Sequence, residues 1–145
     1  MHSVCLRDCF HPSPNTHDPR RLHMLTFDNI ISDRGSKYAV SGAAAATEQE
    51  VKALLKELKR TKRFAKATHN TWGILLRDTP VKNDDGESGA GMVILRMLER
   101  AELRNHLIVV TRWYGGKHLG GDRFRHVQDA VRHYLDATQI GKAKR

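Results

Sequence analysis

The sequence predicts an α/β (α+β) fold, a two-layer sandwich with the element order β-β-α-β-α-β-α. Two strand-like segments surround a turn early in the chain, and three apolar stripes at helical spacing follow. Between the last two stripes, HLIVV (106–110) is a short continuous apolar run, typical of a central buried strand. The length of 145 residues suits one domain. No run approaches the roughly 18–20 apolar residues that a membrane span needs, so we expect no membrane partner.

The first half of the chain predicts a hairpin and a helix. MLTFDNIISD (24–33) and KYAVSGAAA (37–45) are the strands, with Asp33-Arg34-Gly35 as the turn. Thr47 is a candidate N-cap because Glu50 stands at the capping-box position. The helix behind it carries an apolar stripe made of Val51, Leu54, Leu55 and Leu58.

The second half predicts two more strands and two more helices. AKATHNTWGILLRD (65–78) resembles a strand, and NDDGES (83–88) is a turn in which Ser88 is placed to cap the next helix. Asp122 is the candidate cap of the last helix. The two helical stripes are Ile94, Leu95, Leu98 and Ala101, and then Phe124, Val127, Val131, Tyr134 and Leu135.

The domain boundaries follow from composition. We expect residues 1–23 to be a disordered tail, residues 24–138 to be the folded domain, and residues 139–145 to be a basic C-terminal tail. A zinc site using Cys5 and Cys9 is an alternative for the first segment, although the spacing matches no standard ligand set; another is that Met24 is the true start. We expect no metal and no cofactor. Because the folded part lacks cysteine, a reducing cytosol or nucleus is the natural compartment, and we expect a cytoplasmic location.

The charge indicates a polyanionic partner. The formal net charge is +9, and residues 36–145 hold the whole excess, with 21 basic against 12 acidic residues. Such a balance favours nucleic acid or an acidic protein surface. The run Lys56, Lys59, Arg60 and Arg63 could follow a phosphate backbone, but a solvated helix face explains it too and is the favoured interpretation.

The glycine-rich segment TRWYGGKHLGGDRF (111–124) does not fit a nucleotide loop. It lacks the Lys-Ser/Thr of a P-loop and the spacing of GxGxxG. Strand alternation predicts Arg112 and Tyr114 on one face and Trp113 on the other. Aromatic side chains beside cations are typical of surfaces that bind single-stranded nucleic acid or protein, although Trp113 could equally be core. The candidate binding residues are Arg112, Trp113, Tyr114, Gly115, Gly116, Lys117, His118, Arg123 and His126.

A second candidate site is a group of carboxylates. Asp84, Asp85 and Glu87, with His69 as a partner, could hold a divalent metal or perform acid–base catalysis. The alternative is that the two aspartates shape a turn and that Glu87 stabilises a helix N-terminus. The alternative is favoured, so an enzyme of unknown reaction is the second functional hypothesis.

Five blocks carry a family resemblance: DRGSKYAV (33–40), ATHN (67–70), DDGES (84–88), VVTRWYGG (109–116) and LGGDRFRH (119–126). Over about residues 25–138 the chain resembles the IMPACT family, and ATHN and DRFRH resemble its eukaryotic branch rather than the bacterial YigZ-type proteins. The resemblance implies a fold like the second domain of a small-subunit ribosomal protein, with a left-handed βαβ crossover. Lys117-His118 and Gly121 depart from the family pattern.

The resemblance also implies a function. It implies regulation of translation in the response to stress and amino-acid starvation, but no assigned biochemical activity for this domain. Together with the basic charge and the aromatic–arginine cluster, it favours a non-enzymatic regulator that binds the ribosome, RNA or a translation-associated protein. By resemblance, the starvation kinase's ribosome-associated activator and actin are possible partners. Eukaryotic members carry an N-terminal RWD domain that mainly engages the activator, and residues 1–23 are too few for such a domain.

Overall fold

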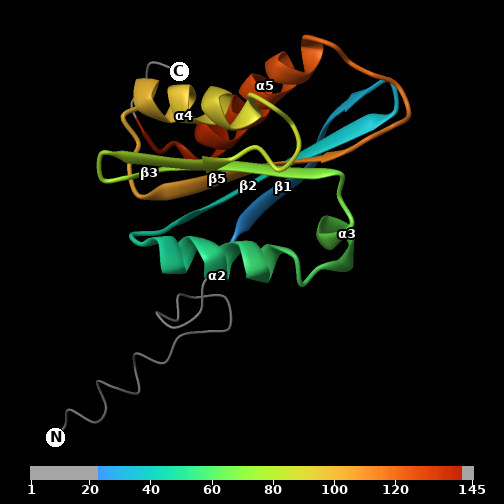
Figure 1. The fold of residues 1–145 in the computed structure, drawn as a ribbon. Coiled ribbons are helices and arrows are strands. Elements are labelled where there is room, and N and C mark those ends of the chain that lie inside the picture. The colour runs from blue at the N-terminus through green and yellow to red at the C-terminus, as the bar shows by residue number, and fades with distance from the viewer. Residues whose placement is uncertain (1–22, 142–145) are drawn as a thin grey trace, which may run out of the picture.

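The computed structural model describes residues 23–141, in which five strands form one sheet in the order β1-β2-β5-β3-β4 (Figure 1). Every neighbouring pair of strands is antiparallel. It follows that β2 and β3, which flank β5, run parallel. Helix α2 therefore lies in a βαβ connection between them, and the left-handedness of this crossover stays a prediction. The strands are β1 (Leu25–Asp33), β2 (Ser36–Ala44), β3 (His69–Leu76), β4 (Thr79–Asn83) and β5 (His106–Trp113).

Helices cover both faces of this sheet. Helices α2 (Glu48–Leu58) and α3 (Lys62–Ala65) lie on one face, and α4 (Ala90–Arg100) and α5 (Asp122–Thr138) lie on the other (Figure 1). The predicted α/β class is confirmed. The predicted two-layer arrangement is corrected to three layers, because helices pack on both faces of the sheet. The predictions for Cys5, Cys9 and the rest of residues 1–22, and for residues 142–145, lie outside the described residues.

The central strands alternate between two separate cores. Tyr38 of β2 and Ile108 of β5 pack with α4 and α5, whereas Ala39 and Val109 pack with α2 and α3. Because β5 is buried on both faces, its sequence is a continuous apolar run and shows no polar alternation. The same alternation determines which side chains at the end of β5 point toward α4 and α5.

Three local predictions have different outcomes. The Thr47 cap is confirmed, because its hydroxyl accepts from the Glu50 amide at 3.1 Å while the Glu50 carboxylate accepts from the Ala46 amide. The Ser88 cap is wrong: the N-cap of α4 is Gly89, and the amides of that first turn donate to Asp84 instead. The Asp122 cap is also wrong, because Gly121 is the N-cap of α5 and Asp122 is its first residue.

The sequence prediction missed β4. Among residues 23–141 this strand pairs only with β3, and it contains Pro80, which cannot donate to a sheet ladder. Proline is tolerated here because β4 forms the edge of the sheet. Short, polar edge strands of this kind lack the apolar pattern by which strands are recognised.

Candidate binding site beside the glycine loop

A row of polar side chains crosses three strands at one end of the sheet. Arg112 of β5 is the register partner of Tyr38 on β2 and of His69 on β3. Tyr38 belongs to the core under α4 and α5, so Arg112 lies on that same face. The predicted orientation of Arg112 is therefore confirmed.

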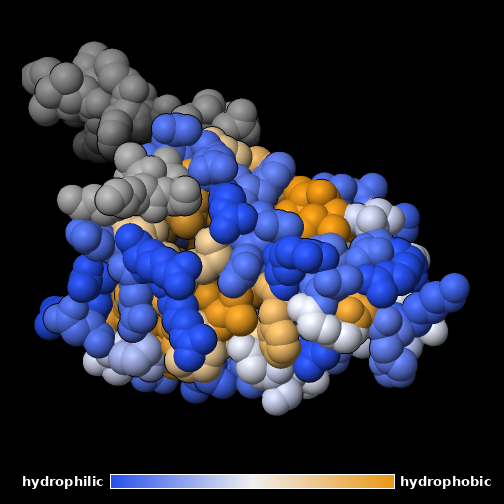
Figure 2. Space-filling view, turned by 90° about the horizontal axis from the view of Figure 1, so that it is seen from above, coloured by the Kyte–Doolittle hydropathy of each residue, from blue (hydrophilic) through white to orange (hydrophobic). Residues whose placement is uncertain are grey.

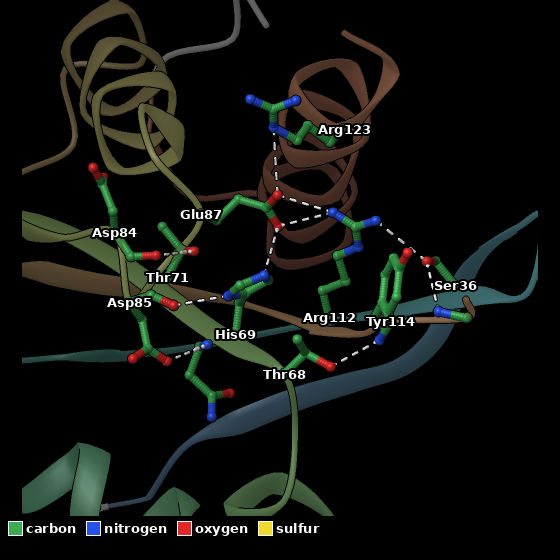
Figure 3. A network of polar contacts seen from close by, with 12 residues as sticks. Ser36, Thr68, His69, Thr71, Asp84, Asp85, Glu87, Arg112, Tyr114 and Arg123 are labelled. Atoms are coloured by element: carbon green, nitrogen blue, oxygen red, sulfur yellow. Dashed lines mark hydrogen bonds and ion pairs between the residues drawn. The ribbon is translucent and has the colours of Figure 1, made fainter. Parts of the chain in front are cut away.

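A buried ion pair lies above this row. Arg112 Nη1 donates to both carboxylate oxygens of Glu87, at 2.9 and 3.2 Å (Figure 3). Each side chain is only 6% exposed. A buried pair of this kind is strongly destabilised when either partner is removed alone, because the other charge is left without compensation.

Ser36 connects Arg112 to the glycine loop. Its hydroxyl accepts from Arg112 Nη2 at 3.4 Å and from the Gly115 amide at 3.1 Å. A Cβ added at Gly115 would lie 2.0 Å from the carbonyl carbon of Gly35, so the loop packs backbone to backbone on the β1–β2 turn. Glycine is required at residue 115 by this contact.

A second guanidinium and an imidazole also lie close to Glu87. Arg123 Nε of α5 lies 3.5 Å from the carboxylate, and His69 Nε2 lies 3.9 Å from it (Figure 3). The other ring nitrogen of His69, Nδ1, donates to the carbonyl oxygen of Asp85 at 2.8 Å. This bond orients the imidazole with Nε2 toward Glu87.

These side chains border an open pocket of about 440 Å³, called here the Arg112–Glu87 pocket. Thr68 holds one wall in place, because its hydroxyl accepts from the Tyr114 amide at 2.9 Å. The lining residues are Thr68, His69, Gly86, Glu87, Ser88, Arg112, Tyr114, His118, Leu119, Gly120 and Arg123.

The four-residue carboxylate cluster does not converge in this pocket. Asp84 accepts from the Gly89 and Gly91 amides at 3.0 and 2.8 Å, and Asp85 accepts from the Asn70 amide at 2.7 Å. The amides and the Lys82 ammonium lower the Asp84 pKa against the opposing effect of its burial. The two aspartates therefore have structural contacts, and only Glu87 and His69 line the pocket.

Trp113 lies on the opposite face of the sheet. It belongs to the core under α2 and α3, and its indole Nε1 donates to the Arg63 carbonyl at 3.0 Å. The Arg63 guanidinium stacks 3.8 Å from the indole ring centroid. The alternation that separates Trp113 from Arg112 and Tyr114 is confirmed, and Trp113 does not line the pocket.

The other candidate residues of the loop divide into exposed and structural groups. Tyr114, Gly116, Lys117 and His118 are exposed. His126 instead packs against Tyr38 and contacts Asp33 at 2.7 Å. Hydrogen bonds from Arg34 and then from His126 hold the pKa of the Asp33 carboxyl well below its usual range. Tyr114, His118 and Arg123 line the pocket, and the exposed Lys117 is next to His118 in the loop; we call these four residues the pocket rim.

The basic run belongs to α2, α3 and the segment between them, and these two helices lie on the face of the sheet opposite α4 and α5 (Figure 1). Arg60 forms an ion pair with Glu57, and Arg63 forms one with Asp28. Lys56 and Lys59 are exposed and form no ion pair with another described residue. The predicted binding residues thus belong to two faces and not to one continuous surface.

Sequence reasoning missed Tyr38, Ser36 and Thr68. Tyr38 is fully buried, and burial raises its pKa to about 12. Nothing in the local pattern distinguishes it from an ordinary core residue. Its neighbours in the site come from β5, the β4–α4 loop and α5, so only the strand register reveals its place.

Comparisons with known proteins decide the family. The model of the family described as "Impact N-terminal domain" matches residues 34–135. The chain belongs to the Impact family. Protein IMPACT of Oryctolagus cuniculus is 38% identical over 111 residues, covering 72% of this chain and 35% of the relative. The Protein IMPACT homolog of Caenorhabditis elegans is 32% identical over 123 residues, covering 79% of this chain and 48% of the relative.

The chain was also compared with solved structures, one of which has a similar fold. A crystal structure described as a hypothetical protein has a TM-score of 0.69 at 22% identity, covering 78% of this chain and 57% of the other. The structure of the two-domain translational regulator Yih1 has a TM-score of 0.48 at 25% identity, covering 92% of this chain and 58% of the other. The chain spans less than half the length of the curated relatives compared above.

Proposed function

We propose that this Impact domain is a non-enzymatic, cytoplasmic regulator of translation that binds RNA or the ribosome through the pocket rim. Membership of the Impact family supports the role in translation, which is what the resemblance implies for its members. The exposure of Tyr114 carries the proposal for the surface. It is 43% exposed and lies beside Arg112, Arg123 and His118, whereas the other large hydrophobics exposed in residues 23–141 are only Leu25 and Met92.

An exposed aromatic ring among cations suits RNA. Bases stack on tyrosine, and guanidinium and ammonium groups bind the phosphates. The view from the α4–α5 side shows a largely hydrophilic surface interrupted by separate apolar areas (Figure 2). Such a surface favours a charged partner over a broad apolar one.

The test compares the two faces of the sheet in ribosome and RNA binding. The rim variant combines Tyr114→Ala with Lys117→Ala, and the matched control combines Lys56→Ala with Lys59→Ala. We expect the rim variant to weaken binding about ten-fold or more, since one stacked base contributes about 1–3 kcal/mol. Wild-type affinity should fall steeply between about 50 and 200 mM salt. Binding that is insensitive to salt, or lost only in the control, contradicts the proposal.

The competing partner is a translation-associated protein, of which the family resemblance offers the starvation-kinase activator and actin. Capture of partners from lysate with and without nuclease separates the two cases. If the chain is retained on ribosomes and nuclease abolishes this retention, RNA is supported as the partner. A protein that stays bound after complete nuclease digestion, and is released by the rim variant, replaces RNA as the partner.

One observation favours the enzyme alternative. His69 is held by the Asp85 carbonyl with Nε2 facing Glu87, in a pocket with two arginines, which suits a general base. This version predicts that His69→Ala abolishes conversion of a bound substrate but preserves its binding. The enzyme hypothesis is contradicted if the wild type forms no product and His69→Ala loses binding of the ligand.

A further inference from the structure

We propose that the Arg112–Glu87 pocket holds a single nucleotide, with its phosphate on Arg112 and Arg123 and its base stacked on Tyr114. The inference rests on the proposed function and specifies how that site recognises RNA. It assigns the pocket to an unstacked nucleotide of a single strand, such as a loop or an end.

The first support is an unsatisfied donor. Arg112 is 6% exposed at its side chain, yet its Nε finds no hydrogen-bond partner within the described part of the chain. Buried polar groups are almost always paired, with protein, water or ligand. Arg112 also lines the pocket, so this incompletely paired guanidinium borders the space that a ligand would occupy.

The second support is the balance of charge. One carboxylate, that of Glu87, faces the guanidinium groups of both Arg112 and Arg123. Arg123 uses Nη1 on the Gly120 carbonyl and Nε near Glu87, and its Nη2 makes no hydrogen bond to another residue between 23 and 141. The arginines therefore keep one positive charge in excess and free donors in a fixed geometry, as phosphate binding requires.

The third support is the aromatic wall. The Tyr114 ring centroid lies 5.6 Å from the Arg112 guanidinium carbon and 5.7 Å from the His118 ring centroid. Tyr114 thus offers a base-stacking surface directly beside the arginines. The pocket volume of about 440 Å³ lies within the range of small-ligand sites. Phosphate and base of one nucleotide can therefore be bound together.

This arrangement excludes an intact duplex as the preferred ligand. Stacking on an aromatic side chain requires a base that is free of its neighbours, as in single-stranded loops and ends. A double helix presents its phosphates but not the faces of its bases. We expect single-stranded RNA to bind more tightly than duplex RNA of the same length.

The experiment follows backbone amide shifts of the ¹⁵N-labelled chain during titration with adenosine 5′-monophosphate, adenosine and inorganic phosphate. Adenosine monophosphate should move the amides of Tyr114, Gly120 and Arg123 with a dissociation constant of about 1 mM. Phosphate alone should move fewer of them, and adenosine should bind more weakly than its phosphate. Equal binding of adenosine and its monophosphate overturns the phosphate part of the proposal.

Variants assign the two halves of the nucleotide. Tyr114→Ala should weaken adenosine monophosphate about ten-fold and leave inorganic phosphate unchanged. Arg123→Met should weaken both by a similar factor, whereas Arg125→Met, also on α5 but outside the pocket lining, should change neither. A wild-type spectrum away from the pocket shows that each variant is folded. Identical affinities in all four proteins overturn the assignment.

A parallel titration with a short single-stranded RNA separates the two proposals. If the RNA binds at the rim but adenosine monophosphate at about 10 mM leaves the pocket amides unmoved, the nucleotide pocket is wrong and the proposed function stands. If neither RNA nor nucleotide binds, both are wrong.

Discussion

Arg112 Nη1 donates to both carboxylate oxygens of Glu87, which joins the end of β5 to the loop before α4 across 25 residues of sequence. Both side chains are almost completely buried, and the pair forms the floor of the candidate site. The geometry of the rim therefore depends on a contact that also contributes to the stability of the fold.

Removing Glu87 alone should strongly destabilise the protein. In Glu87→Ala, the Arg112 guanidinium stays buried without its partner, and we expect a loss of about 3–5 kcal/mol in the free energy of unfolding. Urea denaturation measures it. Asp122→Ala, which removes an exposed partner of Arg34 and Arg125, should cost about 1 kcal/mol or less. Equal losses in the two variants would show that burial of the Glu87 pair is unimportant.

A methyl group at Gly115 should separate the glycine loop from the β1–β2 turn. Its Cβ would lie 2.0 Å from a backbone carbon of Gly35, and backbone cannot yield as a flexible side chain does. We expect Gly115→Ala to cost about 1–3 kcal/mol or more in thermal unfolding. Gly121→Ala is the control, since it has negative φ and no atom within 4 Å of an added Cβ. A Gly115 variant as stable as the Gly121 variant refutes the close packing.

Asp84 should stabilise α4, and Ser88 should not. The Asp84 carboxylate accepts from the Gly89 and Gly91 amides, so Asp84→Ala should cost about 1–2 kcal/mol, the usual effect of losing a helix cap. Ser88→Ala should change stability by less than about 0.5 kcal/mol. Chemical denaturation of both variants decides between the two residues, and a larger effect at Ser88 would restore the capping role that the sequence suggested.

Acid should destabilise the fold through His106. Burial lowers the His106 pKa to about 4, while its Nε2 contacts the Tyr134 hydroxyl at 2.8 Å. The unfolded chain takes up this proton near pH 6.5 and the folded chain does not, so stability is present above pH 6.5 and is lost as the pH falls toward 4. We expect a loss of about 1 kcal/mol between pH 7 and pH 5, allowing for partial exposure.

The acid effect has a direct control. His106→Gln should flatten the pH dependence of unfolding between pH 7 and pH 5, whereas replacing the exposed His23 with glutamine should leave it unchanged. An unaltered slope in the His106 variant would show that another group causes the acid sensitivity.

The parts of the fold that the sequence predicted are those governed by local rules. The capping box at Thr47 and the alternation of Arg112, Trp113 and Tyr114 need only neighbouring residues, and both are confirmed. The face of the sheet that α2 covers does not follow from such local rules. An apolar stripe shows that a helix packs on the sheet, but it does not specify the face, so the third layer was not predicted.

The site was predicted only in part for the same reason. The Arg112 row depends on the register of three strands, and the Glu87 pair connects segments that are distant in sequence. Turn chemistry did favour a structural role for Asp84 and Asp85, and their bonds to backbone amides confirm it. Tyr38 offered no local signal, since only its partners distinguish it from other core residues.

The most direct test of the account maps single-stranded RNA on the ¹⁵N-labelled chain at low salt. We expect the largest amide shifts at Tyr114, His118 and Arg123, and we expect these shifts to disappear in Tyr114→Ala combined with Lys117→Ala. Shifts confined to Lys56, Lys59 and their neighbours on α2 would contradict the account, because they would place binding on the opposite face of the sheet.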